Sequence, residues 1–251
     1  MTKQVLITAG ASGIGRAMAD GFAAAGFGVW VADLDAEALE GCPQDWGRSC
    51  GDVADEGFVA SVVAEMMAAR GQIDVLCANA GIAGPTAPVE EVDLADWRSC
   101  LAVNLEAAFL VAKHVAPVMK AQKSGSIIVT SSTAGQHGYP YRAPYAAAKW
   151  AVIGLMKTLA MELGPFGIHA NAIAPGSVEG PRMEGVLARE AAAKGMTRDE
   201  VYAGYASGTS MRRFVEAADI AEMAVFLGSD AARLVSGQVI AVDGHTVNPD
   251  P

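Results

Sequence analysis

The segment YAAAK, residues 145–149, contains two side chains whose types and spacing suggest chemistry. Tyr145 and Lys149 are four residues apart, so on a helix they share one face, about one turn from each other. A phenol with a pKa of about 10 is a poor base at neutral pH, but a neighbouring ammonium favours the phenolate and lowers that pKa. The pair could therefore act as a general acid–base unit, although surface helices also carry Tyr and Lys by chance.

A hydroxyl group precedes this pair by thirteen residues. Ser132 closes SIIVTSS, residues 126–132, an apolar run typical of a buried strand. A serine at that point could bind the reacting oxygen of a substrate. It could also merely end the strand.

A glycine-rich turn lies near the start of the chain, in LITAGASGIG, residues 6–15. Gly10, Gly13 and Gly15 give the spacing Gly-x-x-Gly-x-Gly between a predicted strand and a predicted helix. Such glycines let backbone N–H groups approach a pyrophosphate, and the helix N-terminus adds a partial positive charge. Ala9 holds the place of a first glycine. We expect it to be tolerated with a negative φ, while Gly10 supplies any flexibility.

An acidic residue follows the turn at the distance that a dinucleotide site requires. Asp33 ends the apolar run GVWVAD, twenty residues after Gly13. A carboxylate there can accept hydrogen bonds from the adenosine ribose and would repel a 2′-phosphate, which predicts NAD(H) in preference to NADP(H). The alternative is an aspartate that only forms a turn or caps a helix.

Strand-like and helix-like runs alternate along most of the chain, and the strands are continuously apolar. Both features predict an α/β fold: a single Rossmann-type domain over residues 1–251, with a doubly wound parallel sheet of about seven strands and helices on both faces. The predicted strands are residues 5–8, 28–33, 48–51, 73–78, 126–131, 169–173 and 238–242, and the predicted helices are residues 14–25, 56–70, 94–121, 143–163 and 217–228.

One stretch interrupts the alternation. Between Pro175 and Ala217 no strand is predicted, and the sequence instead indicates two short helices with glycine breaks. This stretch leaves the carboxyl end of a strand, where open α/β sheets bind ligands. We expect a small helical lid over the substrate, at about residues 177–212; a surface excursion is the alternative.

Composition excludes several classes of protein. The formal net charge of −10 argues against nucleic-acid binding. No apolar run approaches the ~18 residues of a membrane span, and the N-terminus lacks a signal layout, so we expect a cytoplasmic protein with no membrane partner. Four cysteines without a CxxC pair and four histidines predict no metal site.

Read together, the motifs resemble those of the classical short-chain dehydrogenase/reductase family. The resemblance spans Val5 to Gly244. It comprises the glycine turn, Asp33, GDV at 51–53, NAG at 79–81, Asn104 in VNL, Ser132, YxxxK at 145–149, PG at 175–176 and SGQVIAVDG near the end. Departures are Ala9, Ala78 in place of the first asparagine of NNAG, Gly180 where a threonine is frequent after PG, and Gly244-His245 where Gly-Gly is frequent.

The resemblance implies roles for individual residues. Tyr145 would exchange a proton with the substrate, Lys149 would lower its pKa and hold the nicotinamide ribose, Ser132 would polarise the carbonyl or alcohol, and Asn104 would organise a relay water. The implied cofactor residues are Gly10, Ser12, Gly13, Ile14, Gly15, Asp33, Leu34, Asp52, Val53, Asn79, Ala80, Gly81, Tyr145, Lys149, Pro175, Gly176 and Val178. The family reaction is hydride transfer between a secondary alcohol and a ketone.

The substrate is less well defined. Beside Ser132 and Tyr145 we expect His137, Tyr139 and Arg182 to contact it, and Arg142 or Arg182 could bind a carboxylate or phosphate, or could simply be solvated or packed. A small polyol, sugar or hydroxy acid is expected. The alternatives are a 3-oxoacyl-thioester reductase and a non-catalytic dinucleotide-binding protein. A homotetramer built through helices 94–121 and 143–163 is a family expectation.

Overall fold

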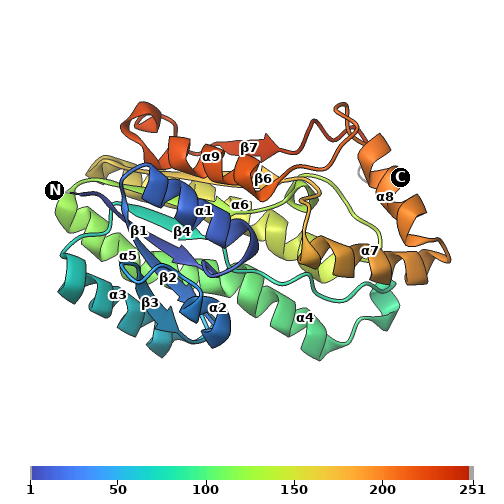
Figure 1. Cartoon of the computed structure of the whole chain (residues 1–251), viewed down its shortest axis with the longest axis horizontal. Helices are drawn as coiled ribbons and strands as arrows, with labels where there is room; N and C mark the ends of the chain where they lie inside the picture. The colour runs from blue at the N-terminus through green and yellow to red at the C-terminus, as the bar shows by residue number, and fades with distance from the viewer. Residues whose placement is uncertain (1, 249–251) are drawn as a thin grey trace.

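The computed structural model describes residues 2–248, and its centre is one parallel sheet of seven strands in the order β3-β2-β1-β4-β5-β6-β7 (Figure 1). This confirms the predicted fold class. The strands are β1 (Gln4–Thr8), β2 (Gly28–Asp33), β3 (Gly47–Cys50), β4 (Val75–Ala78), β5 (Gly125–Thr130), β6 (Ile168–Pro175) and β7 (Val239–Val242). β3 begins and ends one residue earlier than predicted, within the usual uncertainty of strand ends.

Helices cover both faces of the sheet (Figure 1). One core contains side chains of α3, α5 and α6, and the other contains side chains of α1 and α9. The helices are α1 (Gly13–Ala24), α2 (Ala36–Glu40), α3 (Glu56–Arg70), α4 (Leu94–Leu101), α5 (Ala107–Gln122), α6 (Ala143–Leu163), α7 (Pro181–Lys194), α8 (Arg198–Ser207) and α9 (Ala217–Gly228). The short α2, which was not predicted, is capped by the Asp35 side chain.

The continuous apolar character of the strands follows from this double cover. In β1, Leu6 packs in the α3–α5–α6 core, whereas its neighbours Val5 and Ile7 pack in the α1–α9 core. All three side chains are fully buried. Successive residues point to opposite faces of a strand, so each position must be apolar when both faces are covered.

The glycine turn corrects our expectation for Ala9. Its φ is +49°, in the left-handed region, rather than negative. Gly10 does not supply the missing freedom: its φ is not positive, and a Cβ there would lie 2.7 Å from Val31 Cγ1. Gly13 has a φ of +53°, and a Cβ on Gly15 would lie only 1.9 Å from the Ala9 carbonyl oxygen. Ala9 is therefore strained, because the close contacts of Gly10 with Val31 and of Gly15 with Ala9 fix the path of the backbone through the turn.

The long helix predicted over residues 94–121 is divided. α4 and α5 are joined by a π-helical segment, Ala102–Glu106, in which Asn104 is buried. By length and composition, Leu94–Gln122 is long and apolar enough to cross a membrane, contrary to the expectation that no segment would be. Here its apolar face packs into the α3–α5–α6 core through residues such as Val111 and Val115.

The segment after β6 contains the two expected helices. α7 ends at Lys194 and is capped by Gly195, whose φ is +67°, and α8 begins with a capping box between Thr197 and Glu200. Both lie at one end of the molecule, beyond the carboxyl ends of the strands (Figure 1). They have a small core of their own, which includes Leu187, Val201 and Tyr205. Whether this pair moves as a lid stays a prediction.

Ala9→Gly is expected to stabilise the protein. Removing the β-carbon relieves left-handed strain, and part of that gain is lost because glycine gives the unfolded chain more freedom, so the free energy of unfolding should rise by about 0.5 kcal/mol. Urea denaturation measures this change. Ala64→Gly, at an exposed position inside α3, is the matched control and should lower the free energy by about 1 kcal/mol. If Ala9→Gly lowered the free energy of unfolding by a similar amount, this would contradict the inference that Ala9 is strained.

Candidate active site

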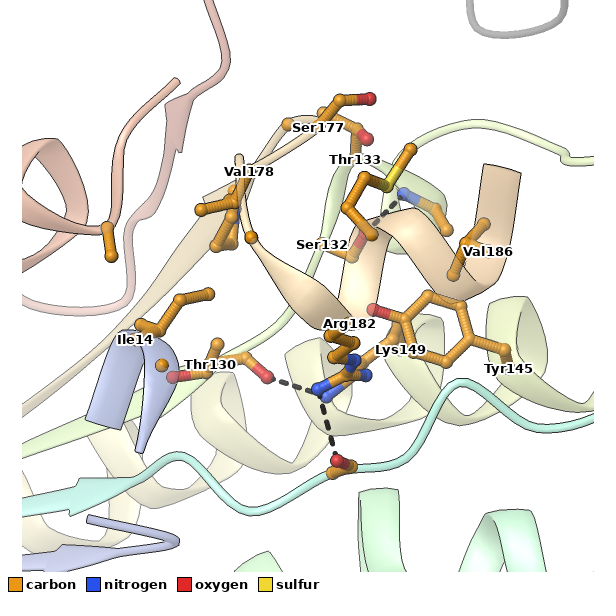
Figure 2. Close-up of a pocket in the computed structure, with 18 of the residues that line it drawn as sticks. Ile14, Thr130, Ser132, Thr133, Tyr145, Lys149, Ser177, Val178, Arg182 and Val186 are labelled. Carbon is orange, nitrogen blue, oxygen red and sulfur yellow. Dashed lines mark hydrogen bonds between the residues drawn. The ribbon is translucent and has the colours of Figure 1, made fainter. Parts of the chain in front are cut away.

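The carboxyl ends of β1, β4, β5 and β6 open onto a cavity of about 360 Å³. This is the edge of a parallel sheet where ligands bind. Residues from the glycine turn, the end of β5, α6 and the start of α7 share its lining (Figure 2). The predicted residues that meet there are Ser12, Gly13, Ile14, Gly15, Asn79, Gly81, Ser132, Tyr139, Tyr145, Lys149, Pro175, Gly176, Val178 and Arg182.

Lys149 is the most deeply buried charged group of the site. Its side chain is 2% exposed, and Nζ donates a hydrogen bond to the Thr130 carbonyl oxygen at 2.9 Å. Burial lowers the pKa of this ammonium, and the charge of Arg182 lowers it further, whereas Tyr145 opposes the shift. A cation in this position is fixed in place beside the tyrosine.

Tyr145 lies among cations. The Arg142 guanidinium carbon is 4.8 Å from the centre of its ring and Lys149 Nζ is 5.7 Å away. Burial alone would raise the pKa of the phenol. The charges of Lys149, Arg182 and Arg142, with a hydrogen bond from Ser132, outweigh burial and hold the pKa below its ordinary value. Figure 2 shows the hydroxyl directed toward the nitrogen ends of Lys149 and Arg182.

The two serines after β5 have different roles. Ser131 donates its hydroxyl to the Lys149 carbonyl oxygen at 2.9 Å, which ties β5 to α6. Ser132 is extended and begins the 3-10 turn Thr133–Gly135, where its Oγ accepts a hydrogen bond from Ala134 N at 3.1 Å. Its hydroxyl also interacts with Tyr145, so it is Ser132 that stands beside the phenol.

Asn104 does not line the cavity but lies directly behind it. Its Nδ2 donates to the carbonyl oxygens of Cys100, at 2.9 Å, and Ile82, at 3.0 Å. Its Oδ1 is buried and has no hydrogen-bond partner among the described residues. A Cβ on Gly81 would lie 2.6 Å from this oxygen and 3.3 Å from Lys149 Nζ. The amide oxygen and the ammonium therefore flank the same space, which suits a bridging water.

A polar network joins three strand ends; the resemblance implied that Asn79 and Ala80 steady the sheet, but sequence reasoning missed Thr8 and Thr130. Thr8 Oγ1 accepts hydrogen bonds from the backbone N–H groups of Asn79, at 3.0 Å, and Ala80, at 3.1 Å. Asn79 Nδ2 donates to the carbonyl oxygens of Thr8 and Ala9, and its Oδ1 accepts from Thr130 Oγ1 at 3.1 Å. The available signal was a threonine at the end of one predicted strand, Thr8, and one residue before the end of another, Thr130.

The glycine turn forms a cradle that suits an anion. Ser12 begins α1 without a side-chain cap, and the first helical turn contains no acidic residue. Space is open where a Cβ on Gly13 would lie. Uncapped N–H groups and the helix dipole therefore face the cavity, which fits the pyrophosphate of a dinucleotide.

The residues expected around adenosine lie beside this cradle, outside the cavity lining. Asp33 Oδ2 accepts a hydrogen bond from Ala11 N at 3.0 Å, and its carbonyl oxygen accepts from Gly51 N at 2.9 Å. These bonds bring the ends of β2 and β3 against the turn. The predicted cofactor residues that do not line the cavity are Gly10, Asp33, Leu34, Asp52, Val53 and Ala80.

On the substrate side, the structure places Tyr139 in the cavity lining but not His137. The backbone N–H of His137 donates to the Thr133 carbonyl oxygen, and contact of its side chain with a substrate stays a prediction. Tyr139 OH is 2.8 Å from Thr133 Oγ1. Val186 and Tyr205 also line it; sequence reasoning missed them because nothing local marks which face of the later helices turns inward.

Known proteins resemble this chain over nearly its whole length. A family model described as enoyl-(acyl carrier protein) reductase matches residues 8–245. Cis-4-hydroxycyclohexanecarboxylate dehydrogenase of Sinomonas cyclohexanicum is 37% identical over 95% of this chain and 94% of its own. A 3-oxoacyl-(acyl-carrier-protein) reductase of Thermotoga maritima is 37% identical over 98% of both chains.

Solved structures show the same similarity in three dimensions. The crystal structure of an NAD+-bound xylitol dehydrogenase superimposes with a TM-score of 0.93 and 30% identity, covering 96% of this chain and 98% of the other. The ordered motifs, the Ser132–Tyr145–Lys149 cluster and these similarities agree. The chain belongs to the classical short-chain dehydrogenase/reductase family.

Proposed function

We propose that the protein is an NAD(H)-dependent oxidoreductase that interconverts a secondary alcohol and a ketone. The observation that carries the proposal is the buried Lys149 ammonium beside a Tyr145 whose pKa is lowered, with Ser132 next to the phenol. This cluster opens onto the cavity that also contains the uncapped N-terminus of α1. The bound nicotinamide supplies or accepts the hydride.

The side chains divide the remaining work. Ser132 and Tyr145 bind the reacting oxygen, which orients it and stabilises its developing charge. Tyr145 accepts the proton in alcohol oxidation and donates it in ketone reduction. Lys149 favours the phenolate and holds the nicotinamide ribose. The free Asn104 Oδ1 binds a water beside Lys149, through which the proton reaches solvent.

Asp33 supports the choice of NAD(H). Its carboxylate lies beside the glycine turn, bound to Ala11 N, where it would repel a 2′-phosphate and accept ribose hydroxyls. The similar xylitol dehydrogenase was solved with NAD+ bound, which agrees with this choice.

For the substrate we propose a small polyol, sugar or hydroxy acid. The similar dehydrogenase named for cis-4-hydroxycyclohexanecarboxylate supports the hydroxy acid. Reduction of a 3-oxoacyl thioester is the second candidate, favoured by the 37% identity to such a reductase. Turnover of acyl thioesters with NADPH, in place of small alcohols with NAD+, would identify it. A protein that binds a dinucleotide without catalysis has no need of the Ser132–Tyr145–Lys149 cluster.

Assembly and location stay predictions. The expected homotetramer has support in apolar side chains that α5 and α6 expose: Phe109 is 48%, Trp150 53% and Met161 81% exposed. Such area on two adjacent helices is typical of an interface between subunits. We retain the expectation of a cytoplasmic protein.

Tyr145→Phe should abolish turnover while NADH still binds. The phenyl ring keeps the packing but cannot exchange a proton, so kcat should fall at least about 1000-fold. Steady-state kinetics measures the loss, and quenching of protein fluorescence measures NADH binding. Tyr202→Phe, outside the cavity lining, is the matched control and should retain activity. Retained turnover in Tyr145→Phe would refute the mechanism.

Asp33→Ser should weaken the preference for NAD+. The native protein should show a higher kcat/KM with NAD+ than with NADP+, and the variant should narrow the ratio about 10-fold or more because the charge that repels the 2′-phosphate is gone. Asp35→Ser, whose carboxylate caps α2, is the control and should leave the ratio in place. Equal use of both cofactors by the native protein would overturn the assignment.

Arg182→Gln should move the pH profile of alcohol oxidation to higher pH. The ionised tyrosine accepts the proton, so kcat/KM rises as pH passes the pKa of Tyr145. The Arg182 charge lowers that pKa, and its removal raises it, so the rising limb shifts upward. Arg233→Gln, an exposed arginine near Asp230, is the control. A limb that stays in place or moves to lower pH would contradict the contribution of Arg182.

A further inference from the structure

Two arginines give the cavity a positive charge beyond that of Lys149. Arg142, immediately before α6, is 8% exposed and lines the cavity. Its Nη2 donates to the Ala83 carbonyl oxygen at 3.1 Å, but its buried Nε has no hydrogen-bond partner among the described residues. A guanidinium that has lost its water without a full set of acceptors is costly, so a ligand that supplies an anionic oxygen would be favoured there.

Arg182 adds a second charge from the start of α7. Its Nη1 donates to the Gly81 carbonyl oxygen at 3.1 Å, and this bond links the start of α7 to the loop after β4 (Figure 2). Within residues 2–248, neither Arg142 nor Arg182 forms an ion pair. Both nevertheless act electrostatically on Tyr145. The positive charge thus lies close to where a substrate must react.

The nearby carboxylates do not cancel the positive charge. Glu179 lines the cavity and accepts a hydrogen bond from Tyr202 OH at 2.7 Å, but the same lining contains three cations, Lys149, Arg142 and Arg182. Glu190 is buried behind Tyr205, whose OH donates to it at 2.6 Å, and it pairs with Lys194 at 3.0 Å. The cavity is therefore a cationic site in a chain whose net charge is −10.

Apolar side chains line the cavity next to the arginines. Met183 and Val186 come from α7, and Ala134 and the ring of Tyr139 come from the segment after β5. These groups suit a hydrocarbon body better than the hydroxyls of a polyol. A ligand that matches this cavity would have an anionic group at the arginines, an apolar body and a reacting oxygen at Tyr145.

We propose that the substrate is a hydroxy or oxo acid with an apolar body, and that Arg142, assisted by Arg182, binds its carboxylate and selects it over neutral alcohols. This rests on the proposed function and narrows its substrate class. Arg142 carries the selection because it is buried and has an unpaired donor, and charge-assisted hydrogen bonds from guanidinium to carboxylate are among the strong ones. Arg182, which also donates a hydrogen bond to the carbonyl oxygen of Gly81, adds to the positive potential at the carboxylate.

The first test compares two ligands that differ in charge and little in shape. Isothermal titration calorimetry measures cyclohexanecarboxylate and cyclohexanecarboxamide binding to the native protein, with and without NADH. The carboxylate should bind about 10- to 100-fold more tightly than the amide. Equal affinities, or no detectable carboxylate binding, would overturn the proposal. Because this test uses the native protein, its outcome does not depend on whether any variant folds.

Variants then assign the preference to its residue. Arg142→Met should remove it, and Arg142→Lys should restore part of it because the charge returns without the planar fork. Arg233→Met, an exposed arginine outside the cavity lining, is the matched control and should keep the full preference. Circular dichroism and thermal unfolding check the fold. A preference that persists in a folded Arg142→Met would overturn the role of Arg142.

Kinetics separates this proposal from the one on which it rests. The kcat/KM of the native protein is measured on 4-hydroxycyclohexanecarboxylate and on its neutral amide. In Arg142→Met the ratio of kcat/KM on the acid to kcat/KM on the amide should fall about 10- to 100-fold, since any effect through Tyr145 lowers both values alike. Equal losses on both would place Arg142 in support of Tyr145 and overturn the selection. Carboxylate preference in binding without hydride transfer to or from any alcohol or ketone would instead overturn the proposed function.

Discussion

The buried ammonium of Lys149 is the constraint on which the site depends. A charge that is 2% exposed must be compensated by its surroundings, and here the compensation comes from the Thr130 carbonyl oxygen and from Tyr145. Both partners have to be brought to the same place, one at the end of β5 and the other on the same face of α6. The hydrogen bond from the Ser131 hydroxyl to the Lys149 carbonyl oxygen fixes how closely α6 approaches the end of β5.

The same edge of the sheet fixes the cofactor cradle. Asn79 bonds to Thr8, Ala9 and Thr130, so the ends of β1, β4 and β5 form one polar network. Gly15 approaches Ala9 so closely that no side chain fits between them. The turn is therefore held both by α1 and by β4, and this explains how an alanine is kept at a φ of +49°.

Features repeated over many residues could be predicted from the sequence, and features set by a single contact could not. Continuous apolar strands predicted the sheet, and the four-residue spacing of Tyr145 and Lys149 placed both side chains on one face of a helix, because both features follow from regular geometry. The φ of Ala9 depends on Gly15 and Asn79, which meet only after folding. The π-helical segment around Asn104 and the 3-10 turn Thr133–Gly135 likewise have no local periodic signal.

The cations around Tyr145 connect proton transfer with the choice of substrate. Lys149, Arg182 and Arg142 together outweigh burial and favour the phenolate. A carboxylate bound to the arginines, as we propose, would offset part of their field, so the pKa of Tyr145 would be higher in the complex than in the free protein. The phenol would then hold its proton more firmly once the acid is bound, and it would keep this proton until hydride transfer to a ketone creates the negative oxygen that accepts it. Arg142 and Arg182 thus act both on the selection of a charged substrate and, together with Lys149, on the acidity of Tyr145.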